Sequence, residues 1–144
     1  MVRLILIFLY TFCINLTYEP SKEDLEFYTK INNYREDNNI PRLQWSTELY
    51  LLAQDKTKHM IEFDYFGHTS PAGLDLRTRM LNTHGKAENL ATGYTTVDDA
   101  LQALKDSPTH NFNLIDARST KVGIYTEDKI TTQIFGDDTL YEEY

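Results

Sequence analysis

The chain has 144 residues, which is room for one domain with a hydrophobic core and excludes a second domain of ordinary size. Hydrophobic residues make up 41% of the chain and charged residues 25%, so the composition excludes a disordered or collagen-like protein. The 14 basic and 22 acidic residues give a net charge of −8, which argues against nucleic acid or an anionic lipid surface as a partner.

The first residues have the pattern of an export signal. An apolar run over residues 4–12 is too short to span a bilayer and fits the apolar part of a signal peptide. Cys13 follows it and is the only cysteine, which excludes a disulfide within the chain. Its place resembles a bacterial lipoprotein site, although Phe12 stands where the usual motif has a small residue. We expect residues 1–13 to be a signal and lipidation segment and residues 14–21 a tether; the alternative is a hydrophobic anchor with an incidental cysteine.

Two long helices are expected next. Ser21 and Asp24 have the spacing of a capping box, and apolar residues at helical spacing predict a helix over residues 22–36. A second helix is predicted over residues 46–60, with a serine cap at its start. Trp45 precedes that cap, where a hydrophobic staple is expected.

Shorter elements follow the second long helix. Residues 64–71 are predicted to form a loop and residues 74–81 a short third helix, which ends at a break over residues 82–85. A fourth helix is predicted over residues 97–105, because its apolar residues recur on one face. Pro108 prevents that helix from continuing.

The end of the chain has β-strand character. Residues 121–126 and 130–135 are rich in β-branched and aromatic residues, and three polar residues separate them, which predicts a hairpin. Helices first and a hairpin last indicate an α+β fold. Residues 137–144 are expected to form an acidic, solvated tail.

Four segments carry a family resemblance. They are INNYREDNNIPRLQWSTELYLLAQDKTKHM, DYFGHTSPAG, AENLATGY and DSPTHNFNLID, the last of which is followed by KVGIYT and TTQIFG. In this order they resemble the bacterial branch of the CAP superfamily, the SCP-like domain of cysteine-rich secretory, antigen 5 and pathogenesis-related proteins. The resemblance implies a three-layer α-β-α sandwich with a small antiparallel sheet, formed by one domain over residues 22–136.

The same resemblance implies a surface cavity, which this family lines with two histidines and two acidic residues. His68 of GHTSP matches the first histidine, Glu88 of AENLA the first glutamate, and His110 of SPTHNFNL the second histidine. Ser107 stands at the position of the second acid, so the set is incomplete. These four are called the cavity residues below. From the residues alone, Glu88 holding its loop and His110 capping a short segment remain alternatives.

Two imidazoles and one carboxylate are the ligand set of a His₂Glu zinc site. The resemblance therefore leaves room for Zn²⁺ or Ca²⁺ held weakly by His68, Glu88 and His110, although no cofactor is required. Most aromatic residues are expected in the core or the cavity wall, with an aromatic groove for lipid or peptide as the alternative.

We expect an exported, monomeric protein of the cell envelope or outer surface, attached to the membrane by a lipid on Cys13. Its expected role is to bind a host protein, an envelope component or a lipid. A metal-assisted hydrolase that uses His68, Glu88 and His110 is the alternative, but no GxSxG nucleophile motif occurs and Cys13 lies outside the domain. A third interpretation is an envelope component whose stable fold is its useful property.

Overall fold

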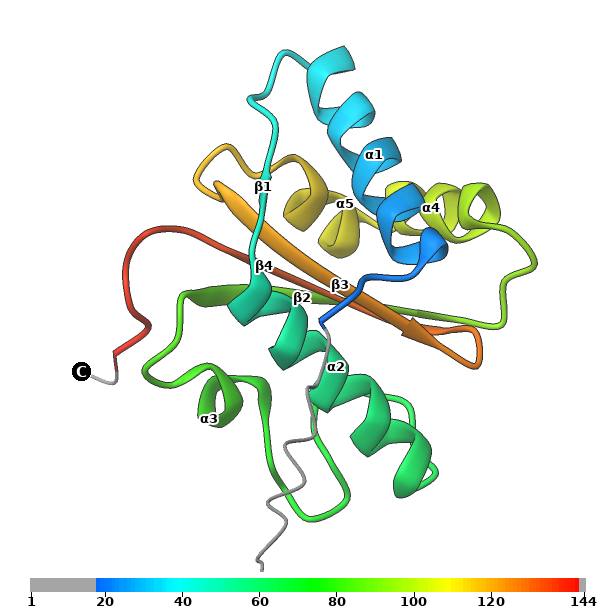
Figure 1. Ribbon diagram of the computed structural model, residues 1–144, viewed down its shortest axis with the longest axis vertical. Coiled ribbons are helices and arrows are strands. Elements are labelled where there is room, and N and C mark those ends of the chain that lie inside the picture. Colours follow the sequence, from blue (N-terminus) through cyan, green and yellow to red (C-terminus); the bar gives the residue numbers. More distant parts are fainter. Residues whose placement is uncertain (1–17, 143–144) are drawn as a thin grey trace, which may run out of the picture.

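The computed structural model describes residues 18–142. In chain order its elements are α1 (Lys22–Asp37), β1 (Gln44–Trp45), α2 (Thr47–Glu62), α3 (Leu76–Met80), β2 (Gly85–Thr92), α4 (Val97–Asp106), α5 (Pro108–Ile115), β3 (Lys121–Glu127) and β4 (Ile130–Gly136). Figure 1 shows the strands in the middle of the molecule, with helices on either side.

The sheet has four strands in the order β1-β3-β4-β2. The expected hairpin is confirmed as β3 and β4, which pair antiparallel and are joined by Asp128 and Lys129. Both turn residues have positive φ, 50° and 59°, as the tight turns of two-residue hairpins require. β2 pairs antiparallel with the other side of β4. The two-residue β1 pairs parallel with β3, so the sheet is antiparallel in its three long strands only.

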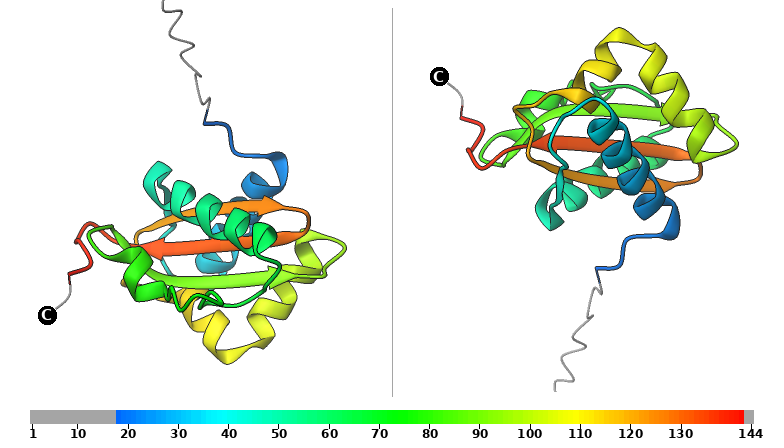
Figure 2. Two further views of the ribbon diagram at one scale, coloured as in Figure 1. Left: turned by 90° about the horizontal axis from the view of Figure 1, so that it is seen from below. Right: turned by 90° about the horizontal axis from the view of Figure 1, so that it is seen from above.

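Helices cover both faces of this sheet (Figure 2). On one face, residues of α2 and α3 form a core cluster with β4: Leu49, Ala53, Met80 and Ile134. On the other face, residues of α1, α4 and α5 form a larger cluster with the strands, which includes Phe27, Ile31, Leu101, Leu104, Leu114, Ile124 and Phe135. The two clusters confirm the three-layer α-β-α sandwich.

The helix starts follow the local signals of the sequence. Ser21 and Asp24 form the predicted capping box at α1, and the side chain of Ser46 caps α2. The ring of Trp45 lies 5.8 Å from that of Tyr50, the fourth residue of α2, so the predicted staple is present.

Several elements differ from the sequence-based expectation. β2 was not predicted, because Gly85–Thr92 combines glycine, alanine, glutamate and asparagine, which have low β-propensity; pairing with β4 makes it a strand. Pro108 does end α4 but is the first residue of α5, where its fixed φ is favourable and no N–H is needed. α3 is also shorter than expected, at Leu76–Met80.

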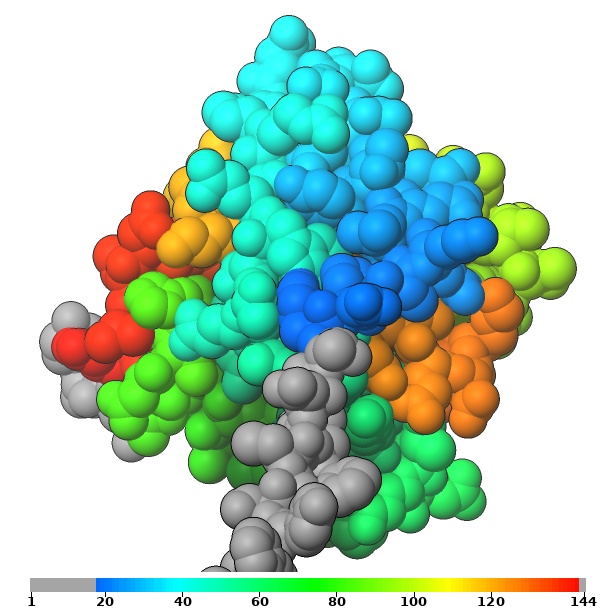
Figure 3. All heavy atoms as spheres, in the orientation of Figure 1, coloured from blue at the N-terminus to red at the C-terminus, as the bar shows by residue number. Residues whose placement is uncertain are grey.

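The segment after β4 is more ordered than a solvated tail. The backbone N–H of Tyr141 donates to Thr83 at 2.7 Å, and Asn82 donates back to the carbonyl of Tyr141 at 2.9 Å. Figure 3 shows this segment, in red, against the green segment that precedes β2. The expected acidic tail is therefore partly docked on the domain.

Candidate functional site

The cavity residues come from three elements that lie far apart in the sequence. His68 lies in the loop between α2 and α3, Glu88 lies on β2, and Ser107 and His110 lie at the start of α5. β2 contacts both α3 and α5, so the fold brings these elements to one edge of the sheet. Cys13 lies outside the described residues.

Glu88 is the buried acid of the site, and its side chain has no exposed surface. One carboxylate oxygen lies 2.8 Å from Nδ1 of His68. Because a carboxylate only accepts hydrogen bonds, Nδ1 of His68 carries the proton of this hydrogen bond. The other oxygen lies 3.5 Å from both terminal nitrogens of Arg79, whose side chain is only 8% exposed. Two partners therefore satisfy the charge of Glu88.

Lys56 of α2 holds the loop that carries His68. Lys56 is fully buried. Its ammonium donates to the carbonyls of Gly67 at 2.5 Å and His68 at 3.2 Å and to the hydroxyl of Tyr65 at 3.2 Å. Burial lowers the pKa of Lys56 to about 8, although the charge of Glu88 acts in the opposite direction. The position of the His68 backbone thus depends on a desolvated lysine.

His110 and Ser107 form a second polar pair. Nδ1 of His110 lies 2.8 Å from the Ser107 hydroxyl, so that hydroxyl makes no cap bond to the α5 backbone. Burial lowers the pKa of His110, and the nearby His68 ring lowers it further. The side chain of Asn89, next to Glu88 on β2, donates to the His110 carbonyl at 3.1 Å and ties α5 to the sheet.

The sequence-predicted trio is only partly brought together. His68 and Glu88 touch, while His110 bonds to Ser107 instead. Within residues 18–142, no three His, Cys, Asp or Glu side chains are placed to hold a metal ion. The second oxygen of Glu88 faces the guanidinium of Arg79, which disfavours a cation there. The geometry therefore does not fit a His₂Glu metal centre.

Sequence reasoning did not identify Arg79 or Lys56 as part of the site. Lys56 had a visible signal, because a charged residue occurs there on the buried and mostly apolar stripe of α2. Arg79 had none, because its partner Glu88 is reached only through the turn that joins α3 to β2.

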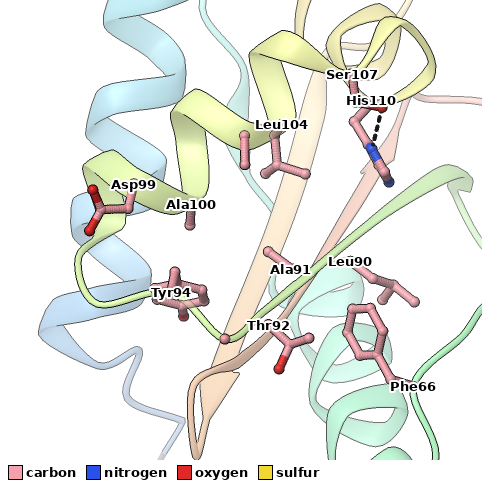
Figure 4. Close-up of a pocket in the computed structure, with 12 residues that line it drawn as sticks. Phe66, Leu90, Ala91, Thr92, Tyr94, Asp99, Ala100, Leu104, Ser107 and His110 are labelled. Carbon is pink, nitrogen blue, oxygen red and sulfur yellow. Dashed lines mark hydrogen bonds between the residues drawn. The ribbon is translucent and has the colours of Figure 1, made fainter.

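A groove of about 480 Å³ opens beside the cavity residues, between β2 and α4 (Figure 4). It is called the β2–α4 groove and is lined by residues 90–94, by Asp99, Ala100, Ala103 and Leu104 of α4, and by Phe66, Ser107 and His110. Most of these side chains are apolar, and Asp99 and His110 lie toward opposite ends. Phe66 is 48% exposed, so this aromatic residue belongs to the groove wall and not to the core.

The chain belongs to the CAP family, the cysteine-rich secretory protein family, whose model matches residues 28–129. A search of curated proteins gave no match.

Solved structures of bacterial CAP proteins have the same fold. An extracellular protein with an SCP domain from Bacillus anthracis is 28% identical, with a TM-score of 0.75; the match covers 81% of this chain and 40% of that one. An outer surface protein of Borrelia burgdorferi is 25% identical, with a TM-score of 0.72 and coverage of 84% and 97%. A cysteine-rich secretory protein of Staphylococcus aureus, 16% identical over 85% of this chain and 40% of that one, shares the fold with a TM-score of 0.67.

The chain thus spans less than half of the Bacillus protein but nearly all of the Borrelia protein. In residues 18–142 there is no helix with the length and apolar character needed to cross a membrane.

Proposed function

We propose that this chain is an exported bacterial CAP-domain protein that acts as a binding module at the cell envelope or outer surface, with the β2–α4 groove as its ligand site. The observation that carries this proposal is the groove itself, an apolar hollow of about 480 Å³ with few polar groups at its ends, the usual character of a ligand site. The extracellular Bacillus and outer surface Borrelia relatives support an exported location. Attachment through a lipid on Cys13 is part of the proposal.

The alternative of a metal-assisted hydrolase has less support. Such an enzyme needs firm ligands, an open coordination position and a separate base. Glu88 is already engaged by His68 and Arg79, and Ser107 offers no second carboxylate. The cavity residues then serve to hold the loop and helix that border the groove.

The proposal is tested by placing a charge in the groove. Ala103 is exposed on α4 and lines the groove, while its neighbour Gln102 is exposed on the same helix and does not line it. We expect the uncharged apolar dye Nile red to bind the full-length chain at least tenfold more weakly in Ala103→Arg than in Gln102→Arg. Because Gln102→Arg adds the same charge outside the groove, dye that binds elsewhere on the protein affects both variants equally. Equal binding by the two variants would exclude the groove as a ligand site.

A separate assay addresses the hydrolase. The full-length chain is incubated with peptide, ester and phosphoester substrates, with and without Zn²⁺ or Ca²⁺, beside Glu88→Gln. We expect no turnover above blank. Turnover that disappears in a folded Glu88→Gln variant would favour the hydrolase over the binding module.

A further inference from the structure

The floor of the β2–α4 groove is the free edge of the sheet. β2 is the outermost strand on its side, next to β4. Leu90, Ala91 and Thr92, the last three residues of β2, all line the groove, although successive side chains of a strand point to opposite faces. The groove therefore exposes the backbone edge of β2 rather than one face of it, and α4 stands opposite that edge (Figure 4).

The register shows which backbone groups point into the groove. In the two-residue hairpin, Glu127 and Ile130 flank the turn and are the closing hydrogen-bonded pair. By alternation, even-numbered residues of β4 bond to β3 and odd-numbered ones bond to β2. Thr131 pairs with Ala91, so Ala91 bonds to β4 while Leu90 and Thr92 direct their N–H and C=O groups outward.

An independent contact supports this assignment. The side-chain amide of Asn113 on α5 lies 3.4 Å from the carbonyl oxygen of Glu88. Glu88 is two residues before Leu90, so its backbone groups point to the same side of β2 as those of Leu90 and Thr92. Asn113 thus covers the edge at Glu88. Nothing comparable occurs farther along: across the described part of the chain, no side chain or backbone group outside the sheet hydrogen-bonds to the backbone of Leu90 or Thr92. The edge without hydrogen-bond partners, called the open edge below, begins beyond the cover of α5; Thr92 is exposed there, while Leu90 is only 6% exposed.

The open edge discriminates between the ligands that an apolar groove could hold. A lipid tail in the groove would remove water from the N–H and C=O groups of Leu90 and Thr92 and give them no partner, which is unfavourable. An extended peptide would pair with the same groups and could lay its apolar side chains against Ala103 and Leu104. The combination of an unpaired strand edge and an apolar wall therefore favours a peptide.

We propose that the β2–α4 groove binds an extended peptide segment of a partner protein by β-strand addition, with the peptide backbone paired to Leu90 and Thr92. This inference rests on the proposed function and specifies the class of its ligand. The net charge of −8, with Asp99 at one end of the groove, favours a peptide that carries a basic residue at that end.

The test uses ten-residue peptides with apolar residues at alternate positions, displayed on phage. The phage that are kept are those that bind the full-length chain more strongly than its Ala103→Arg variant. The selected peptide is then synthesised with N-methyl groups on either set of alternate amides. We expect one set to weaken binding at least tenfold and the other to leave it nearly unchanged, because only one edge of the peptide faces β2. In the complex, hydrogen exchange of the Leu90 and Thr92 amides should slow at least tenfold.

Three outcomes would overturn the inference and leave the proposed function standing, provided that Nile red still distinguishes Ala103→Arg from Gln102→Arg. The first is equal binding of both methylated peptides, or unchanged exchange at Leu90 and Thr92. The second is displacement of the dye by a long-chain fatty acid but by no selected peptide. The third is slowed exchange that depends on protein concentration and accompanies dimer formation, which would make a second copy the occupant. Loss of the dye difference itself would instead contradict the proposed function.

Discussion

The carboxylate of Glu88 accepts a hydrogen bond from Nδ1 of His68 at 2.8 Å, and the two side chains differ sharply in exposure, 0% for Glu88 and 50% for His68. A buried acid is thereby linked to the surface through a histidine and to the interior through Arg79. Removal of the acid and removal of the histidine should therefore have different consequences.

Glu88→Gln should lower the free energy of unfolding by about 2–4 kcal/mol, because it removes the negative charge that faces the guanidinium of Arg79 and acts on the ammonium of Lys56. His68→Ala should cost less than about 1 kcal/mol, because this side chain is half exposed. Urea denaturation of both variants provides the comparison. Glu88→Gln as stable as wild type would contradict the structural role assigned to this acid.

The free energy of unfolding should depend on pH through the buried Lys56. Its folded pKa of about 8 lies below the ordinary value of 10.5, so between these pH values the unfolded chain binds more protons and stability rises with pH. The difference in unfolding free energy between wild type and Lys56→Met should thus increase by up to roughly 3 kcal/mol from pH 7 to pH 10. Lys58→Met, at an exposed position of the same helix, is the control, because it also removes a lysine charge but leaves the buried Lys56 in place.

Gly123 permits close contact between β3 and α2. A Cβ atom at this position would lie 1.9 Å from the backbone nitrogen of Tyr50 and 2.1 Å from the carbonyl carbon of Leu49. Because these are backbone atoms, Gly123→Ala should destabilise the domain by more than about 3 kcal/mol or prevent folding.

Gly93 is the matched glycine, since it has φ of +72° and no atom within 4 Å of an added Cβ. Gly93→Ala should cost only about 1–2 kcal/mol, from backbone strain alone. Thermal melts of the two variants test the contrast. Similar melting temperatures would show that β3 and α2 can move apart.

Zn²⁺ should bind far more weakly than the ~10–16 kcal/mol of structural zinc sites, because Glu88 is occupied and only two imidazoles remain. Binding through His110 should persist to a lower pH than for an ordinary histidine, since burial lowers the pKa of His110 and the ring stays neutral. Calorimetry of wild type and the His68→Ala/His110→Ala variant measures this. Tight binding by the wild type that is lost in the double variant would show that these histidines do form a metal centre.

Cys13 should be acylated in the native host, and metabolic labelling with a radioactive fatty acid should mark the wild type but not Cys13→Ala. The reason is its place directly after an apolar run too short to span a bilayer. Cys13→Ala should also leave the membrane fraction. An unlabelled wild type, or a variant that stays membrane-bound at the wild-type level, would show that Cys13 is not an anchor.

The sequence by itself determined the local structure. Ser21, Asp24 and Ser46 specify helix starts within a few residues, and the β-rich runs around Asp128 and Lys129 specify the hairpin, because these signals act between neighbours in the chain. Motif order also indicated the family, and it nominated the four cavity residues as candidates. None of these inferences required knowledge of which distant segments meet.

Only the tertiary structure decided β2, the partners of Glu88 and the open strand edge. Residues 85–92 have weak intrinsic β-propensity and become a strand because β4 provides their hydrogen bonds. Arg79 and Lys56 reach the site from α3 and α2, and their charges matter only once burial removes water from them. The free groups of Leu90 and Thr92 follow from strand order and register, which arise from pairing between segments about 40 residues apart in the chain.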